Sequence, residues 1–376
     1  MEEQKRFLAL DIGDAHFMFA FFEVHGKTLN TILWGREETG PLFLKHSLES
    51  VWQTIQQQYL VWKQNNKNAA DKVILTLSPS VCKSSIMRLG LKRKDPRRSI
   101  DAKEEQSIMD ETSHGAEKKM KEALFEKHGI HENDFVLQNL EVLKTSIDGY
   151  VVSHLQGCTG AAIEFEFLGT FLPFVYKQRI QSLISLHQLG EPIVAHEVQL
   201  LRAFSKAKRQ DGVFIDVGDS MSLITVMREG ELCFVKEVAW GVDALAKSLE
   251  HAFGMEENIA REFRETYAKG GLSEEVRKKV RELFLPEMKI FGRMIRESLE
   301  AWIGVFPSLV FLFGEGFLMP ELLEIIESDA VQGLSFIDVH EVSLFLPTRI
   351  AEVQNFSQAS NPLYTTLFLE YYYAAQ

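Results

Sequence analysis

Apolar residues near the start of the chain gather in short runs whose spacing predicts an α/β layer. Residues 7–13, 16–24 and 28–34 form three such runs, separated by turn residues, and predict a meander of three strands. The first run is apolar on both faces, as expected for a central strand of a helix-covered sheet. Apolar residues at helical spacing predict an amphipathic helix over 47–63, and residues 71–77 predict another buried strand. Strands and a helix in this order form an α/β layer.

The pattern changes after Ser78-Pro79, where a different kind of segment begins. A long charged stretch over 99–128 predicts a helix with a narrow apolar face, and 176–189 predicts a second helix that ends at Gly190. Strand-like patterns occur at 81–91, 135–143, 150–155 and 161–168. Residues 80–190 are therefore predicted to be an α+β insertion.

The opening pattern is repeated in the second part of the chain. The runs LALDIGD, from Leu8, and FIDVGD, from Phe214, both end in Asp-x-Gly-Asp and lie about 205 positions apart. A second apolar run and a Trp-Gly pair follow each copy at matching positions. This repeat predicts two related halves, residues 1–79 and 211–360.

The elements around the second copy complete the predicted organisation. The first half is expected to be closed by residues 191–210 and by a C-terminal helix over 361–376. The second half is expected to carry a helical insertion over about 241–303, from helices at 241–253, 256–268 and 273–303, the last with Pro286 at a start or kink. An apolar strand over 308–313 then leads into Gly314-Glu315-Gly316 and a helix that opens near Pro320.

Composition narrows the class of protein. The 376 residues can form two or three domains, and 45% hydrophobic with 25% charged residues is typical of soluble globular proteins. A net charge of -12 argues against a general nucleic-acid binder, which needs an excess of Lys and Arg. Three separated cysteines favour a reducing, cytoplasmic environment, and no apolar run approaches the ~20 residues of a membrane-spanning helix.

A strand that ends in Asp-x-Gly and turns back can bind an anion. Gly13 and Gly218 would let backbone amides approach a phosphate, while Asp11 and Asp216 could hold a hydrated Mg²⁺. Taken alone, a segment of this kind is more often an ordinary hairpin turn. Two copies together with the Gly314–Gly316 loop favour a nucleotide site. The chain has no P-loop, nucleophile elbow or His-Glu-x-x-His zinc motif.

His196-Glu197 is another polar pair of interest, directly before the second half. These residues could act at the site, or they could be a helix cap and a first-turn acid. His154 and Cys158 lie in a strand-to-loop region and are not expected to bind a metal.

These motifs resemble those of the actin-like ATPase superfamily. Leu8–Gly13 and Phe214–Val226 are similar to its two phosphate motifs, and Leu312–Pro320 (LFGEGFLMP) is similar to its adenosine motif. The chain more closely resembles the PilM (type IV pilus assembly) and FtsA (cell division) families, which carry an SHS2-like subdomain, called 1C, where this chain has residues 80–190. The resemblance implies an α/β fold of duplicated actin-like, ribonuclease H-like halves.

The resemblance also implies a site and its cofactors, ATP and Mg²⁺. The metal would be bound through water by Asp11 and Asp216, and Glu197 would orient an attacking water. The implied nucleotide-binding residues are Asp11, Gly13, Asp14, Asp216, Gly218, Asp219, Ser220, Gly241, Gly314 and Gly316.

The chain departs from this family pattern at several positions. Asp14, Ala15 and His16 stand where a hydroxyl residue and a lysine are usual, and Glu315 replaces a glycine. The carboxylates of Asp14, Asp219 and Glu315 would repel phosphates unless Mg²⁺ screens them. We therefore expect a slow ATPase at most.

The resemblance implies a function and partners as well. The chain ends at the closing helix, without the amphipathic membrane tail of FtsA relatives, as PilM relatives do. We therefore expect a cytoplasmic adaptor that reaches the inner membrane peripherally, by binding the N-terminal peptide of a PilN-like protein, without inserting directly. Homo-oligomers are a second expectation. Two alternatives are a nucleotide-free scaffold and a sugar-kinase-like phosphotransferase of the same superfold.

Overall fold

The computed structural model describes residues 5–14, 16–26, 28–38, 57, 72–129, 134–187 and 193–374. The chain divides into two compact units, one formed by Met1–Ser80 with Leu183–Gln376 and the other by Val81–Ser182. The helix predicted over 47–63 lies outside the described residues, apart from Gln57. None of the described helices is long and apolar enough to cross a membrane.

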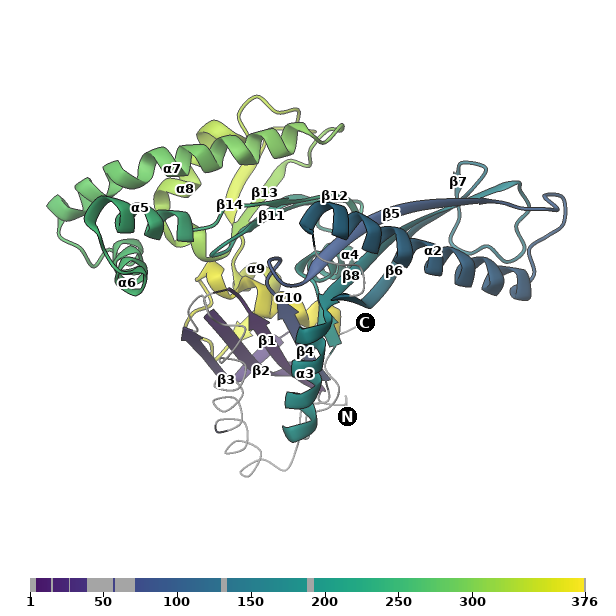
Figure 1. Cartoon of the computed structure of the whole chain (residues 1–376), viewed down its shortest axis with the longest axis horizontal. Coiled ribbons are helices and arrows are strands. Elements are labelled where there is room, and N and C mark those ends of the chain that lie inside the picture. The colour runs from purple at the N-terminus through teal and green to yellow at the C-terminus, as the bar shows by residue number, and fades with distance from the viewer. Residues whose placement is uncertain are drawn as a thin grey trace. The chain divides into compact units, whose positions relative to one another are not determined.

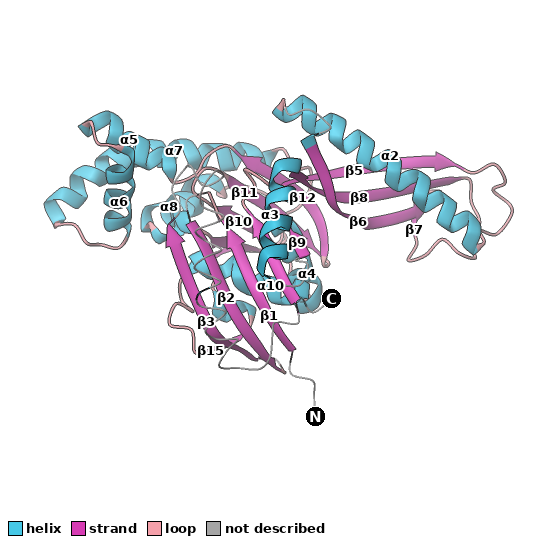
Figure 2. Cartoon of the chain, turned by 60° about the horizontal axis from the view of Figure 1, so that its bottom comes forward, coloured by secondary structure: helices cyan, strands magenta, loops and turns pink. Residues whose placement is uncertain are grey.

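The first sheet of the larger unit has the strand order β15-β3-β2-β1-β4-β9 (Figures 1 and 2). Its strand β1 runs antiparallel to β2 and parallel to β4, and Leu8, Ala9 and Leu10 in it are fully buried. The central position predicted for this strand is confirmed. The strands are β1 (Lys5–Ile12), β2 (His16–His25), β3 (Thr28–Glu38), β4 (Lys72–Leu77), β9 (Ile193–Ala195) and β15 (Glu352–Gln354).

The second sheet repeats this topology, with the order β12-β11-β10-β13-β14. Strand β10 runs antiparallel to β11 and parallel to β13, as β1 does between β2 and β4. The turns match as well, because Gly13 N donates to His16 O (2.9 Å) and Gly218 N donates to Met221 O (3.0 Å). The strands are β10 (Gly212–Val217), β11 (Ser222–Arg228), β12 (Glu231–Val238), β13 (Leu309–Phe313) and β14 (Glu341–Leu344).

Helices of the larger unit follow the apolar periodicity of the sequence. Pro286, expected at a helix start or kink, lies inside one continuous helix, because buried Phe284 and Met288 hold the turns on both sides of it in the core. The helices are α4 (Glu197–Lys208), α5 (Asp243–Phe253), α6 (Glu257–Ala268), α7 (Glu274–Glu300), η2 (Glu315–Leu318), α8 (Pro320–Ile325), η3 (Ile326–Ala330), α9 (Pro347–Ile350), η4 (Pro362–Tyr364) and α10 (Thr365–Ala374).

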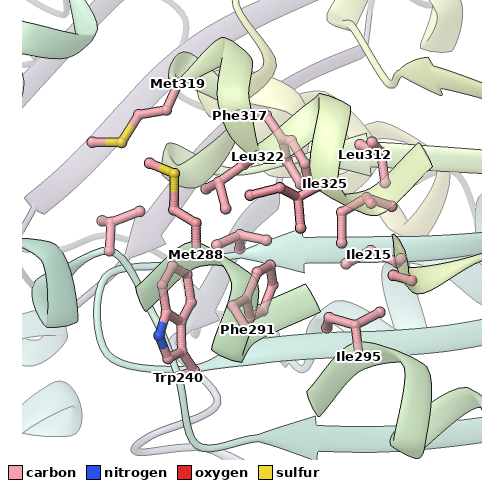
Figure 3. Packing of buried hydrophobic residues seen from close by; sticks show 14 of the residues in the cluster. Ile215, Trp240, Met288, Phe291, Ile295, Leu312, Phe317, Met319, Leu322 and Ile325 are labelled. Carbon is pink, nitrogen blue, oxygen red and sulfur yellow. The ribbon is translucent and has the colours of Figure 1, made fainter. Parts of the chain in front are cut away.

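A hydrophobic core joins the second sheet to α7 and α8. Trp240, just after β12, stacks on Phe291 of α7 with ring centroids 4.2 Å apart (Figure 3). Ile215 of β10 and Leu312 of β13 contribute to the same core from the sheet. This packing fixes the ends of β10 and β13, where the predicted site residues lie.

The smaller unit is an antiparallel sheet with one long helix on one face (Figure 2). Its core places Met120 and Leu124 of α2 against Phe165 and Phe167 of β8. The elements are β5 (Lys83–Lys92), α2 (Ala102–His128), β6 (Phe135–Ile147), β7 (Tyr150–Val151), β8 (Ala162–Pro173) and α3 (Phe174–His187), with the sheet order β5-β8-β6-β7.

One predicted strand is shorter than expected. The segment 150–155 is a strand only at Tyr150–Val151, because the chain then enters a loop in which Gly157 has a positive φ of 86°. The predicted α/β class is confirmed. The predicted domain limits and the SHS2-like identity of the insertion stay predictions.

Candidate functional site

The two Asp-x-Gly turns face one small cavity in the larger unit. Its volume is about 50 Å³, and it lies at the carboxyl ends of β1, β4 and β10. Of the site residues predicted from the sequence, the cavity is lined by Asp11, Gly13, Asp14, Glu197, Asp216, Gly218, Asp219 and Gly314. The repeat thus brings together segments that are about 205 residues apart in the sequence.

Three predicted site residues are not among those that line the cavity. Ser220 donates its hydroxyl to the carboxylate of Asp14. A side chain at Gly241 would collide with the carbonyl of Asp219, and one at Gly316 would collide with Val217. Both glycines therefore allow close packing around the site. Gly314 has this role too, because its φ is +89° and a Cβ there would collide with Asp216.

The second turn is held by the start of α5. The amides of Val242 and Asp243 donate to the carbonyls of Gly218 (3.1 Å) and Asp219 (2.9 Å). These amides at a helix N-terminus are the kind of donor that could bind an anion. Here they bind the turn of the chain itself.

Three acids line the cavity, the buried Glu197 and the half-buried Asp11 and Asp216. Burial raises the pKa of Asp11 to about 7, with the charge of His16 opposing this shift and that of Asp216 adding to it. Burial also raises the pKa of Asp216 to about 6, although a hydrogen bond with Glu197 lowers it in part. The pKa of Glu197 lies well above its ordinary value through burial and the charge of Asp216. The acids therefore hold protons to unusually high pH.

Glu197 combines the two roles that its sequence position allowed. It is the first residue of α4, whose cap is His196, with Nδ1 accepting from Val198 N at 3.2 Å. Gln199 completes a capping box by accepting from His196 N at 2.9 Å. The cap directs the first turn of α4 toward the cavity, so Glu197 is both a first-turn acid and a residue of the site.

A fourth acid approaches from the C-terminal helix. Glu370 of α10 is fully buried and accepts from the Thr76 hydroxyl (2.9 Å) and the Leu10 amide (3.3 Å). Burial, together with the charge of Asp11, raises the pKa of Glu370 well above its ordinary value. The apolar pattern of the tail predicted a packed helix and gave no sign of this acid.

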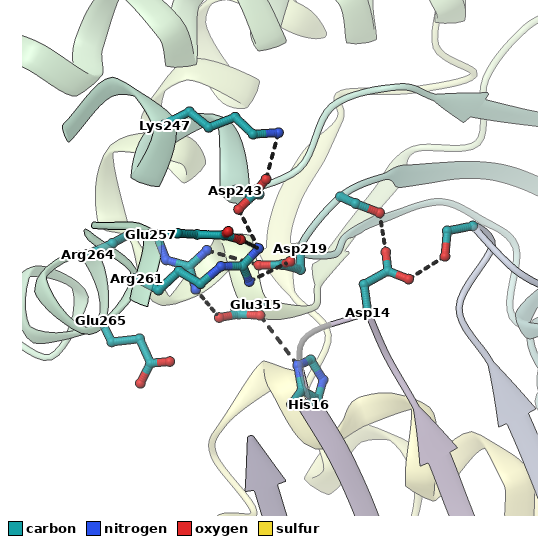
Figure 4. A network of polar contacts seen from close by, with 12 residues as sticks. Asp14, His16, Asp219, Asp243, Lys247, Glu257, Arg261, Arg264, Glu265 and Glu315 are labelled. Atoms are coloured by element: carbon teal, nitrogen blue, oxygen red, sulfur yellow. Dashed lines mark hydrogen bonds and ion pairs between the residues drawn. The ribbon is translucent and has the colours of Figure 1, made fainter. Parts of the chain in front are cut away.

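Two arginines of α6 supply the positive charge beside the cavity (Figure 4). Arg264 donates to Asp219 (3.2 Å) and to Glu315 (2.5 Å), and Arg261 donates to Asp219 (3.0 Å) and Asp243 (2.6 Å). Sequence reasoning missed both. Their spacing of three on a predicted helix, which puts them on one face, was the available signal.

The ion-pair network also reaches the first half of the fold. His16 Nδ1 of β2 lies 3.5 Å from Glu315 Oε2. Burial alone would lower the pKa of His16, but the hydrogen bond and charge of Glu315 outweigh it and raise the pKa. In turn, the charge of Arg264 and the contact with His16 overcome burial and hold the pKa of Glu315 far below its ordinary value. Glu315 is therefore ionised at neutral pH, with Oε1 accepting from Arg264 and Oε2 facing His16 at 3.5 Å.

Asp14 makes a second connection across the cavity. Its two carboxylate oxygens accept from the hydroxyls of Ser80, which follows β4, and Ser220, which follows β10. Where the resemblance implied a hydroxyl residue and a lysine, the chain has an acid that binds its own serines.

The donor set fits a hydrated Mg²⁺ better than it fits a triphosphate. Two half-buried carboxylates, Asp11 and Asp216, suit an ion that keeps several waters. In the described part of the chain, no group of three or more His, Cys, Asp or Glu side chains is arranged to hold a metal directly. Ligand pockets usually have ~300–1,000 Å³ and this cavity has about 50 Å³, so a triphosphate could enter only if carboxylates in its wall moved away from their present partners.

A larger hollow of about 850 Å³ lies between the start of α7 and α8. It is lined by charged side chains of both signs, including Arg277, Lys278 and Glu324. Glu321 in its wall accepts from the Tyr267 hydroxyl (2.6 Å) and pairs with Arg281 (3.4 Å). The hollow is open to solvent and all of its lining residues are charged, whereas small-molecule sites are usually enclosed and mostly apolar.

Comparison with known proteins identifies the fold. No family model matches the chain, and no curated protein matches it. Among solved structures, PilM in a PilM–PilN type IV pilus biogenesis complex is 13% identical, with 96% of each chain covered and a TM-score of 0.68. The ethanolamine utilization protein EutJ from Carboxydothermus hydrogenoformans is 10% identical, with 98% and 89% covered and a TM-score of 0.48. A Bacteroides thetaiotaomicron protein of actin-like ATPase fold is 9% identical, with 97% and 96% covered and a TM-score of 0.44. The chain thus has the actin-like ATPase fold, in a form that resembles PilM.

Proposed function

We propose that this chain is an actin-like adaptor that organises a membrane-associated assembly, such as a type IV pilus, and is a slow ATPase at most. The observation that carries the proposal is the cavity of about 50 Å³ between the two turns, which acids and arginines of the chain itself close. A fast ATPase must admit and release nucleotide in each cycle, and the carboxylates paired inside this cavity oppose its entry. The likeness to PilM over 96% of each chain supports this reading.

The proposed partner is the N-terminal peptide of an inner-membrane protein. The PilM structure that resembles this chain is that of a complex with PilN. An adaptor of this kind would lie on the cytoplasmic side of the membrane and reach it through the partner. Self-association into oligomers is compatible with this role, and division or secretion machinery is an alternative assembly.

Weak binding of nucleotide is the first expected result. ATP with Mg²⁺ would have to displace Asp14, Asp219 and Glu315 from their partners, so we expect a Kd above about 1 mM, worth less than ~4 kcal/mol. Isothermal titration calorimetry with ATP and Mg²⁺ measures it. Asp11→Ala and Gly218→Val are the controls that show whether any heat comes from the cavity. Micromolar binding, or steady ADP release in the presence of a small hydroxyl substrate, would instead favour the phosphotransferase alternative.

Capture of a membrane-protein peptide is the second expected result. Immobilised N-terminal peptides of inner-membrane proteins encoded near this chain should include one that retains it. A scrambled peptide of the same composition should not retain it, because recognition of an extended peptide depends on the order of its side chains. Failure of every peptide would argue for a different kind of adaptor.

A further inference from the structure

The two arginines of α6 are a cationic pair buried beside the cavity. Arg264 has a side chain that is only 2% exposed, and its two nitrogens bind Asp219 and Glu315, which are also buried. Arg261 is 13% exposed and is shared between Asp219, Asp243 and Glu257. Each guanidinium is thus occupied by carboxylates of the chain itself.

These carboxylates lie between the arginines and the cavity. Asp219 and Glu315 are among the residues that line it, whereas Arg264 is not (Figure 4). Asp219 is held in place by the amide of Asp243, which donates to its carbonyl. Glu315 is held at the start of η2 and by His16. Both acids therefore present their oxygens to Arg264 from fixed backbone positions.

A carboxylate and a phosphate compete for the same face of a guanidinium. Both offer two oxygens in the planar geometry that arginine binds best. An acid fixed in the chain has the advantage of a high effective concentration, at the millimolar level or above. A phosphate from solution must therefore displace an internal competitor.

We infer that Asp219 and Glu315 are internal anions that mask an anion-binding arginine pair and so keep phosphate groups out of the cavity. The contact is autoinhibitory, and the masked ligand class is a polyphosphate, either free or as part of a nucleotide. This inference rests on the proposed function, since it gives the reason why nucleotide binds weakly. Removing one of the internal charges should expose the site.

Glu315→Gln and Asp219→Asn test the inference, because each removes one charge and keeps the shape of the side chain. Calorimetry with inorganic tripolyphosphate and, separately, with ATP should detect at least tenfold tighter binding by each variant than by the unsubstituted protein. Tripolyphosphate alone tests the phosphate chemistry, and any extra affinity for ATP measures what the nucleoside adds. Glu257→Gln is the matched control, because Glu257 touches Arg261 from the exposed side of α6 and should leave binding unchanged.

The outcomes separate this inference from the proposed function. Equal binding by the unsubstituted protein and by both folded variants would overturn the masking alone. Micromolar binding of ATP by the unsubstituted protein would overturn the proposed function. A variant that unfolds for lack of the internal anion should regain its thermal transition in millimolar tripolyphosphate, because a ligand of the folded state stabilises it. No such recovery would count against the inference.

Discussion

Replacing Arg264 with alanine is expected to lower the free energy of unfolding at pH 7 by about 3–5 kcal/mol. The substitution leaves Asp219 and Glu315 buried with much of their counter-charge removed, since Arg264 binds both. Removing one partner of a buried ion pair costs far more than the net contribution of the pair, because the remaining charge has lost its solvation. Chemical denaturation followed by circular dichroism measures the change.

The dependence of this effect on pH identifies its cause. The pKa of Glu315 is held low in the folded protein, so its contribution to stability is present above the ordinary glutamate pKa of 4.5 and is lost as pH falls. The difference between Arg264→Ala and the unsubstituted protein should therefore shrink below about pH 4. Lys269→Ala is the control on the same helix, where an exposed pair with Glu265 should contribute less than about 1 kcal/mol. If Arg264→Ala lowered the free energy of unfolding by less than about 1 kcal/mol, or by the same amount at every pH, the buried ion pairs would not be the cause.

The sequence predicted the sheets well because the burial of a strand determines which of its residues are apolar. Strand β1 is apolar on both faces, and the same pattern recurs in β10, so the repeat predicted two strands in equivalent positions. Both lie between an antiparallel and a parallel neighbour. The Asp-x-Gly turns follow from the same repeat. Core packing requires apolar residues at particular positions of a strand, so the strand can be predicted from the sequence alone.

The charge balance of the site was harder to predict. The carboxylates of Asp219 and Glu315 were expected to need Mg²⁺ as a screen, and instead they find Arg261 and Arg264. Ion pairs between residues so far apart leave no local pattern. The sequence of α6 does contain one sign of the network. Arg264 lies on the buried face of this helix, together with Ala260 and Tyr267. A charged residue in such a position needs a buried partner, and this rule could have identified Arg264.

A related correction concerns His16. The sequence gives it no partner, whereas in the structure it links β2 to Glu315. Its pairing depends on a partner about 300 positions away, which only the fold brings close. Glu315 and His16 are thus the two sides of one contact.

Replacing Asp11 with asparagine is expected to stabilise the protein at pH 8 by roughly 2–4 kcal/mol. The pKa of Asp11 is about 7 in the folded protein, against an ordinary value of 3.8. Between these values the folded state keeps a proton that the unfolded state releases, so the contribution of Asp11 to stability is greatest below about pH 4 and is lost as pH rises through 7. Asparagine has the same shape and no charge to bury, and it removes this loss. The pKa of Asp216 is about 6 in the folded protein, so Asp216→Asn should also stabilise the protein at pH 8, but by a smaller amount.

Thermal unfolding from pH 4 to pH 8 measures the effect, with the exposed Asp110→Asn as a control that should change little. The advantage of Asp11→Asn should be near zero at pH 4 and grow with pH. A loss at pH 8 would mean that a bound cation or other group holds the acid ionised, and an equal advantage at both ends would mean that the effect does not come from the titration of Asp11. If the expected result is found, the chain keeps two buried acids that lower its stability at neutral pH. Acids whose pKa is shifted this far by burial and by neighbouring charges are often functional groups. Asp11 and Asp216 would then be the groups of the cavity that are poised to act, and the arginine-bound carboxylates the groups that close it.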